Sequence, residues 1–204
     1  MVPDAAISNT SRARLIEAGR TLMAEMGYEG AATAAIARRA ATSESQLMRY
    51  FGGKAGLLEA IFDEGWTQLN GQIETVIEGA PNVPAALVEL LSLFIAVFDR
   101  DQQLARLFLF EGRRPRGPRA EIRLSRGYVA FIERIAELVV RGQRGGSLST
   151  AFDPRMLVAA MFGAAEAMVR DRLMNQRREG AGIDSAADLR QVFEAMIKGF
   201  AAPG

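Results

Sequence analysis

The sequence of 204 residues contains no cysteine and no histidine. These two absences exclude disulfides, thiol nucleophiles, imidazole general bases and the usual zinc sites. Acid–base catalysis would then depend on Asp, Glu or Lys alone, and no pair of carboxylates stands out on one helix. We therefore expect a protein that is not an enzyme and that needs no metal or other cofactor.

An excess of charge of one sign is also lacking, because the formal net charge is +1. Such a balance does not by itself indicate nucleic-acid binding. The most apolar stretch, 85–98, includes Glu89 and is shorter than the roughly 20 residues that span a bilayer, so we interpret it as a buried core helix. No signal peptide is visible at the N-terminus. We expect a soluble, cytoplasmic protein without membrane contact.

Alternation typical of strands is rare, whereas helical spacing of apolar residues recurs along the whole chain. The first part predicts short helices over 11–26 and 32–40, then a third that Ser43 caps and Gly52 ends, and a fourth from Lys54 to about Ile77. Longer helices are predicted over 85–99, 101–112, 119–141, 154–177 and 186–201, with Gly or Pro in the breaks. The predicted fold class is all-α. We place the domain boundary near residue 53, with domains at 1–53 and 54–204 and a connector helix at 54–79.

The second and third helices have the form of a helix-turn-helix. Their apolar residues, among them Ile36 and Leu47, would pack the two helices together. Polar side chains then face outward near the start of the third helix, where such motifs meet base edges in a major groove. Gln can pair with adenine, Arg with guanine or a phosphate, and Lys54 with a phosphate. The candidate DNA-binding residues are Ser43, Glu44, Ser45, Gln46, Arg49, Tyr50 and Lys54.

A plainer interpretation is also open. A small amphipathic helix that ends in Gly-Gly-Lys is often just part of a helical bundle, and helix-turn-helix geometry occurs in proteins that do not bind DNA. Residues 1–56 contain seven basic and five acidic residues, a net charge of only +2. Charge therefore adds little to the DNA-binding interpretation.

The wider spacing of residues 12–62 resembles the DNA-binding domain of TetR-family transcriptional regulators. The matching segments are RLIEAGRTLMAEMGYEG, IARRA and LMRYFGGKAGLLEAIF. The resemblance implies a transcriptional regulator with an N-terminal three-helix helix-turn-helix domain and a C-terminal helical domain for ligand binding and dimerisation. Its partners would be a double-stranded DNA operator, a second copy of the chain and a small-molecule effector. Most members of the family repress, so we expect a repressor that a mainly apolar effector releases.

Four positions depart from the family pattern. Ala31 and Ala32 stand where Thr or Ser often opens the second helix, and Met48 stands where Tyr often contacts a phosphate. Ala41 stands where Gly is frequent, so a turn that needs positive φ there would cost a few tenths to about 1 kcal/mol.

The resemblance also implies a dimer formed by the last two long helices. The helix at 154–177 carries a stripe of small residues that would let a second helix approach closely, and the helix at 186–201 carries an apolar stripe wider than one core needs. Both stripes could instead serve the chain's own core. The candidate interface residues are Ala160, Gly163, Ala164, Ala167, Val192, Phe193 and Met196.

The remaining helices of the family enclose a ligand. Aromatic residues and Met suit an apolar, adaptable site, although the more common role for any one of them is to pack the core. The candidates are Trp66, Phe94, Phe98, Phe108, Tyr128, Phe131, Met161 and Phe162.

Arginines are concentrated between Arg113 and Arg126. They could form a solvated loop, bridge to Glu59 or Asp63 of the connector helix or add to the DNA-facing potential, or bind an anionic head group. A second function from another class also stays open: a helical small-molecule-binding protein whose helix-turn-helix no longer reads DNA, for which Ala31, Ala32 and Met48 are the sequence support.

Overall fold

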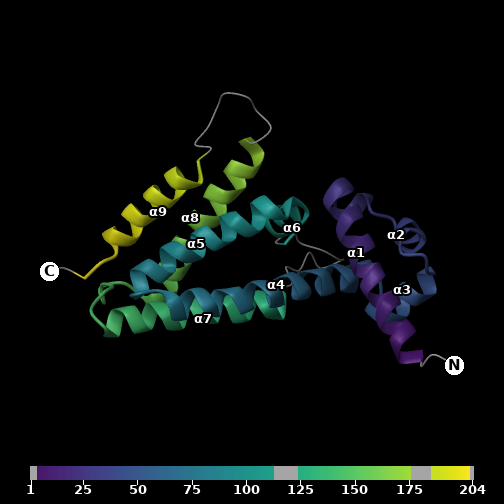
Figure 1. Ribbon diagram of the computed structural model, residues 1–204, viewed down its shortest axis with the longest axis horizontal. Helices are drawn as coiled ribbons and strands as arrows, with labels where there is room; N and C mark the ends of the chain where they lie inside the picture. The colour runs from purple at the N-terminus through teal and green to yellow at the C-terminus, as the bar shows by residue number, and fades with distance from the viewer. Residues whose placement is uncertain (1–3, 113–123, 176–184, 203–204) are drawn as a thin grey trace. The chain divides into compact units, whose positions relative to one another are not determined.

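The computed structural model describes residues 4–112, 124–175 and 185–202, with side chains from Thr10 onward. Every regular element in these ranges is helical, which confirms the all-α fold class. The elements are α1 (Asp4–Gly30), α2 (Thr33–Arg39), α3 (Glu44–Phe51), α4 (Lys54–Gly79), α5 (Val83–Arg100), α6 (Gln102–Arg106), η1 (Leu107–Glu111), α7 (Arg126–Arg144), α8 (Pro154–Asn175) and α9 (Ala186–Gly199) (Figure 1). Within the described residues, no helix is both long and apolar enough to cross a membrane.

Three of the predicted helices differ from the structure in their bounds. The first helix begins at Asp4 rather than Ser11 and continues past Gly27, where φ of 75° and ψ of 166° interrupt it. The predicted helix over 101–112 divides into α6 and a π-helical turn, η1, whose hydrogen bonds span one residue more than those of an α-helix. The helix predicted from residue 119 begins at Arg126, after Ser125, a residue type that favours helix N-caps.

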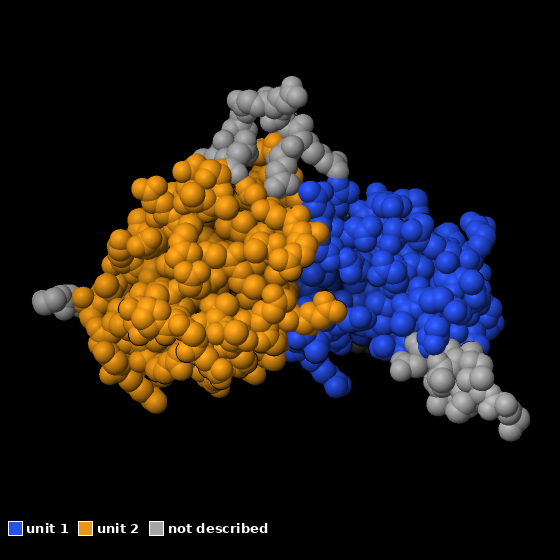
Figure 2. Space-filling model, viewed as in Figure 1, with its two compact units in different colours: residues 1–67, 101–127 blue, residues 68–100, 128–204 orange. Residues whose placement is uncertain are grey.

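The chain forms two compact units (Figure 2). Unit 1 comprises residues 1–67 and 101–127, and unit 2 comprises residues 68–100 and 128–204. The division falls inside α4 because α6 and η1 pack on α1 although they follow α5 in the sequence. Packing units and functional domains are different properties, so the predicted domain boundary near residue 53 stays a prediction.

Unit 1 is built around fully buried aliphatic residues contributed by α1, α2, α3 and α4. Leu15, Ile36, Leu47 and Leu57 have no exposed surface. Two further contacts hold α6 and η1 in this unit. Arg20 of α1 forms an ion pair with Asp101, whose other carboxylate oxygen caps α6 by accepting from the Leu104 amide at 3.0 Å.

Phe108 of η1 lies against the first half of α4. Its ring centroid is 5.5 Å from that of Phe62 and 4.9 Å from that of Trp66. A Cβ atom added at Gly65 would come within 2.9 Å of the Phe108 ring, so glycine lets η1 approach α4 closely. The short helix after α5 is therefore fixed to unit 1 by aromatic contacts as well as by an ion pair.

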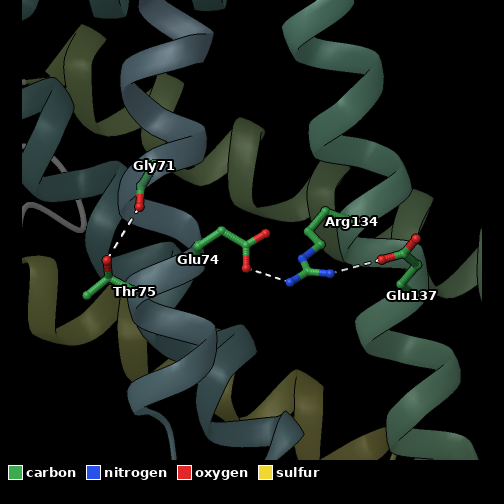
Figure 3. A network of polar contacts seen from close by, with 5 residues as sticks. All are labelled: Gly71, Glu74, Thr75, Arg134 and Glu137. Atoms are coloured by element: carbon green, nitrogen blue, oxygen red, sulfur yellow. Dashed lines mark hydrogen bonds and ion pairs between the residues drawn. The ribbon is translucent and has the colours of Figure 1, made fainter.

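Unit 2 is centred on α5, which buries most of its apolar side chains and so confirms the core-helix interpretation of 85–98. Its other helices are joined by ion pairs between neighbouring elements. Arg134 of α7 donates to Glu74 of α4 at 2.5 Å and to Glu137 at 3.1 Å (Figure 3). Arg172 of α8 donates to Asp99 of α5 at 2.6 Å.

The last helix, α9, packs mainly on α5. Leu189, Phe193 and Ile197 form its buried face. Arg190 reinforces this packing, because its guanidinium donates to Glu89 and to Ser92 of α5, each at 2.6 Å. The hydrogen bond between Arg190 and Glu89 lowers the pKa of the Glu89 carboxyl and raises the pKa of the Arg190 guanidinium from their ordinary values.

Candidate nucleic-acid interface

The turn between α2 and α3 is closed by backbone hydrogen bonds. The amide of Ala41 donates to Arg38 and the amide of Thr42 donates to Ala37, at 3.1 and 3.0 Å. Ala41 has φ of 49°, in the left-handed region that favours glycine. The turn therefore requires positive φ at this position, so the energetic cost predicted for Ala41 applies.

Helix α3 begins and ends as the sequence predicts. The Ser43 side chain accepts from the Gln46 amide at 3.3 Å, which is an N-cap interaction. Gly52 adopts the left-handed conformation at the C-cap, with φ of 68°. Between them Leu47 is fully buried, and it fixes the orientation of the polar side chains on the opposite face.

The predicted DNA-binding residues of α3 differ in how they are held. Glu44 and Ser45 are exposed, and the Glu44 carboxylate accepts from the Thr33 hydroxyl of α2 at 2.5 Å. The amide oxygen of Gln46 is buried and has no hydrogen-bond partner among the described residues. An unsatisfied buried oxygen is unfavourable, so a rotation that turns this amide toward a hydrogen-bond donor would relieve the cost.

Arg49 and Tyr50 contact each other. An Arg49 Nη2–H donates to the Tyr50 hydroxyl at 3.1 Å, and the guanidinium carbon lies 5.0 Å from the Tyr50 ring centroid. Arg49 is exposed and Tyr50 is half-buried. The two residues therefore act together at the outer surface of α3.

Lys54 has an intramolecular role that its spacing did not indicate. Its ammonium donates to the carbonyls of Tyr28 and Glu29, at 2.8 and 3.3 Å, and lies 4.4 Å from the Tyr28 ring centroid. These contacts join the start of α4 to the end of α1. The structure thus places Lys54 beside helix α1, while its contact with a phosphate stays a prediction.

Two arginines of α1 belong to this surface although the sequence argument did not select them. Arg12 is exposed and its guanidinium lies 5.5 Å from the centroid of the Phe51 ring. Arg14 donates to the Ala40 carbonyl at 2.9 Å and so supports the end of α2. Contacts between residues about 26 to 39 positions apart depend on tertiary packing, and no local spacing reveals them.

Six of the eight predicted ligand-binding residues lie in unit 2. Five of their side chains form a chain of ring contacts across α5, α7 and α8, with centroid separations between 5.3 and 5.8 Å. They are Phe98, Phe94, Phe131, Phe162 and Tyr128. Met161 is buried on α8. Trp66 and Phe108 lie in unit 1 and contact each other there, so the structure does not bring all eight into one unit.

The predicted interface residues of α8 are exposed or half-buried in the single chain. Ala160 and Gly163 are exposed, Ala164 and Ala167 are half-buried, and a Cβ atom added at Gly163 would meet nothing within 4 Å. Met156, one turn before Ala160, is 69% exposed and extends this face. Sequence reasoning missed Met156, although its spacing of four from Ala160 was a usable signal.

The predicted interface residues of α9 divide between two faces. Val192 is 50% exposed, whereas Phe193 is 4% exposed and packs within unit 2. Met196 is half-buried. Only the Val192 side of α9 is therefore open to a second chain.

No group of three or more acidic residues in the described part of the chain could hold a metal ion. Of the arginine cluster at 113–126, all but Arg126 lie outside the described residues, and Arg126 is exposed at the start of α7. The polar surface of α3, with its exposed arginine and its hydrogen-bonding side chains, is thus the site with the most specific chemistry.

The segment that contains α2 and α3 also matches a known family. Residues 15–61, which contain α2 and α3, match the family model described as bacterial regulatory proteins, tetR family. The chain is 23% identical over 191 residues to the fatty acid metabolism regulator protein of Bacillus subtilis, covering 91% of this chain and 93% of the relative. It is 25% identical over 157 residues to the HTH-type transcriptional regulator UidR of Escherichia coli, covering 75% and 79%.

The fold is also shared with a solved structure of FadR from Bacillus subtilis in complex with stearoyl-CoA. The TM-score is 0.76 at 20% identity, over 92% of this chain and 96% of that chain. These relatives regulate transcription and are not enzymes. Residues 15–61 therefore match the DNA-binding segment of the tetR family of bacterial regulatory proteins, and the chain as a whole is similar to regulators of transcription.

Proposed function

We propose that this protein is a homodimeric, ligand-responsive repressor that binds an operator through α3 and is released by a small, mainly apolar effector. The observation that carries the DNA-binding part is the geometry of α2 and α3. The capped helix α3 presents Ser45 and Arg49 on the face opposite its buried Leu47, with half-buried Gln46 beside that face. This arrangement suits insertion into a major groove, where Gln and Arg can contact base edges.

The DNA-binding domain in this proposal is residues 1–53, followed by α4 as the connector. Ser43, Glu44 and Tyr50 complete the proposed contact surface around α3. Lys54 would reach a phosphate only with its remaining N–H, because two carbonyls of α1 already accept from its ammonium. Its larger contribution would be to hold α1 against the start of α4.

Dimerisation would use the outward faces of α8 and α9. The exposed positions Met156, Ala160, Gly163 and Val192 support this part of the proposal. Small residues allow a second helix to approach closely, and exposed Met and Val supply apolar area for burial. Phe193 would contribute indirectly, by holding α9 in place.

The effector would contact the aromatic chain of unit 2. The Phe131 ring contacts both Phe94 and Phe162, and the three residues come from three different helices, so a ligand that separates their rings would move those helices. The relative crystallised with stearoyl-CoA makes a long acyl chain the first effector to test. For Trp66 and Phe108, which pack in unit 1, a ligand contact stays a prediction.

The regulation would be a shift between two populations. A dimer binds two half-sites when its recognition helices are about 34–36 Å apart. An effector that prefers another spacing lowers operator affinity only by its differential affinity for the two states. Repression follows when the operator overlaps a promoter, which the genomic position of the selected sites would decide.

Selection of bound sequences from a pool of random duplexes tests the proposal. We expect a two-fold symmetric site, a complex of two chains per site, and release of that complex by stearoyl-CoA or stearate. Recovery of no enriched sequence would exclude DNA binding. Retention of the complex at every effector concentration would exclude the acyl chain as the releasing class.

A second candidate function is a small-molecule-binding protein that no longer reads DNA. Two observations favour it: the Gln46 amide oxygen is turned inward, and the Lys54 ammonium is occupied by carbonyls. The same selection separates the two candidates, because this one predicts ligand binding without any enriched DNA sequence.

A further inference from the structure

Four side chains from α1 and α3 form a continuous series of cation and ring contacts. The Arg12 guanidinium lies 5.5 Å from the Phe51 ring centroid. The Phe51 ring meets the Tyr50 ring edge-on, at 6.1 Å and an interplanar angle of 64°. The Arg49 guanidinium lies 5.0 Å from the Tyr50 ring centroid. An aromatic pair is thus flanked by two exposed arginines, one from each helix.

The Arg49 guanidinium is held at two points. The Tyr50 ring covers it, and the Tyr50 hydroxyl accepts one of its N–H groups at 3.1 Å. Arg49 forms no ion pair with a carboxylate in the described part of the chain, and Glu44 of the same helix contacts Thr33. The guanidinium is therefore positioned without being neutralised, and its other N–H groups remain available to a ligand.

Arg49 shares a helix face with the first turn of α3. It follows Ser45 by four residues and Gln46 by three, which are the spacings of neighbours on a helix surface. In helix-turn-helix proteins the residues at the N-terminal end of the recognition helix meet base edges. Arg49 thus extends the base-facing surface toward the end of α3.

We propose that Arg49 reads a guanine in the major groove and that Tyr50 is the positioning residue that fixes its guanidinium for this contact. The planar fork of Arg matches the O6 and N7 acceptors of guanine in a bidentate pair. Tyr50 reduces the rotamer freedom that Arg49 would otherwise lose on binding. This assignment rests on the proposed DNA-binding function and gives it one specific base.

Arg12 provides the matched comparison. It has the same charge, the same exposure class and the same kind of ring contact as Arg49, but it lies on α1, outside the two helices of the motif. Side chains there are placed for the phosphate backbone, which positions a protein without carrying sequence information. Removal of the Arg12 side chain should therefore weaken binding to every DNA sequence alike, whereas removal of the Arg49 side chain should weaken binding most where the guanine is present.

The test uses the full-length protein and duplexes carrying its selected site. Each guanine of one half-site is replaced in turn by 7-deazaguanine, which lacks the N7 acceptor, or by inosine, which keeps O6 and N7 and lacks only the minor-groove amino group. Affinities are measured over a range of salt for the unaltered protein and for Arg49→Ala, Arg49→Lys, Tyr50→Phe and Arg12→Ala. Thermal unfolding of each variant confirms that it is folded.

For the unaltered protein we expect 7-deazaguanine at one position to weaken binding by about 5- to 150-fold, with inosine there having little effect. Arg49→Ala should abolish that difference. Arg49→Lys should reduce it with the salt dependence unchanged, because an ammonium can still donate to N7 but lacks the planar fork of Arg. Tyr50→Phe keeps the ring and removes the hydroxyl, so the difference should shrink by about 2- to 12-fold. Arg12→Ala should keep the full difference and reduce the salt slope by about one per subunit.

Persistence of the 7-deazaguanine effect in Arg49→Ala, or equal weakening of all duplexes by that change, would assign Arg49 to a phosphate and overturn the inference alone. An unchanged difference in Tyr50→Phe would remove the positioning role of Tyr50. Failure of the unaltered protein to select any sequence would instead remove the proposed function, and the guanine contact with it. The two kinds of failure are therefore distinct.

Discussion

The outward faces of α3 and α8 are both exposed, but they are built in opposite ways. On α3 the charged side chains are tied to partners in the same chain, Glu44 to Thr33 and Arg49 to Tyr50. On α8 the residues are small, and Gly163 has open space where a side chain would begin. A positioned polar face suits a ligand with fixed hydrogen-bonding groups, such as DNA. A face of small residues suits a second helix, which contributes the side chains itself.

Gly163→Glu should produce the largest effect, and it tests whether the face of α8 forms an interface at all. The change adds a charge on the open face, so the single chain should keep its fold. In a packed dimer two like charges would be buried near each other, at a cost of about 3–5 kcal/mol. We expect a monomer by sedimentation, with loss of operator binding.

Gly71→Glu is the matched control, because Gly71 is an exposed glycine of α4 that also has open space around it. This control should stay dimeric. A dimer of unchanged stability in Gly163→Glu would place the interface elsewhere.

Replacing two phenylalanines of unit 2 by alanine distinguishes a side chain that packs the core from one that contacts the ligand. Phe98 is 6% exposed, so Phe98→Ala should lower the free energy of unfolding by about 3–5 kcal/mol. Phe162 is half-buried beside Tyr128 and Phe131, so Phe162→Ala should cost less and should reduce the effector response more.

Urea unfolding and effector-dependent DNA release measure the two properties separately. Equal destabilisation by both substitutions, together with an unchanged effector response, would identify Phe162 as core alone.

The recognition surface was more predictable from sequence than the dimer face, for a physical reason. Ser43 and Gly52 specify the ends of α3 locally, and buried Leu47 then determines which side chains face outward. On α9 the apolar stripe is wider than one face, and only packing on α5 shows that Phe193 points inward and Val192 outward.

Tertiary packing also determines side-chain partners that the spacing of residues along the sequence cannot indicate. Lys54 is held by carbonyls 25 and 26 residues before it, and these exist in the right place only once α1 has packed against α4. Arg12 meets Phe51 for the same reason. The fold class followed from helical periodicity, whereas the partners of single long side chains did not.

Ala41→Gly, in the turn between α2 and α3, should have a smaller effect on stability. Ala41 has φ of 49°, and glycine adopts this conformation without the steric cost of a Cβ atom. We expect the free energy of unfolding to rise by about 0.4–1 kcal/mol. The comparison is Ala34→Gly in α2, an exposed helical position where glycine should destabilise by about 1 kcal/mol. Destabilisation by both changes would mean that the turn does not hold Ala41 in a strained conformation.

Glu89→Gln should give the smallest effect and should separate the inner face of α9 from its outer face. The hydrogen bond from Arg190 lowers the pKa of the Glu89 carboxyl below its unfolded-state value. Its contribution to stability is therefore complete above the ordinary glutamate pKa of about 4.3 and is lost as the pH falls through the lower, folded-state pKa. Because the Glu89 side chain is 45% exposed, solvent screens the pair and limits its value to about 0.2–1 kcal/mol.

The variant should be slightly less stable than the unaltered protein at pH 7, and the difference should vanish in acid. It should remain dimeric at both pH values, because Glu89 supports the packing of α9 on α5 rather than the open face. Dissociation of Glu89→Gln would show that the two faces of α9 are not independent.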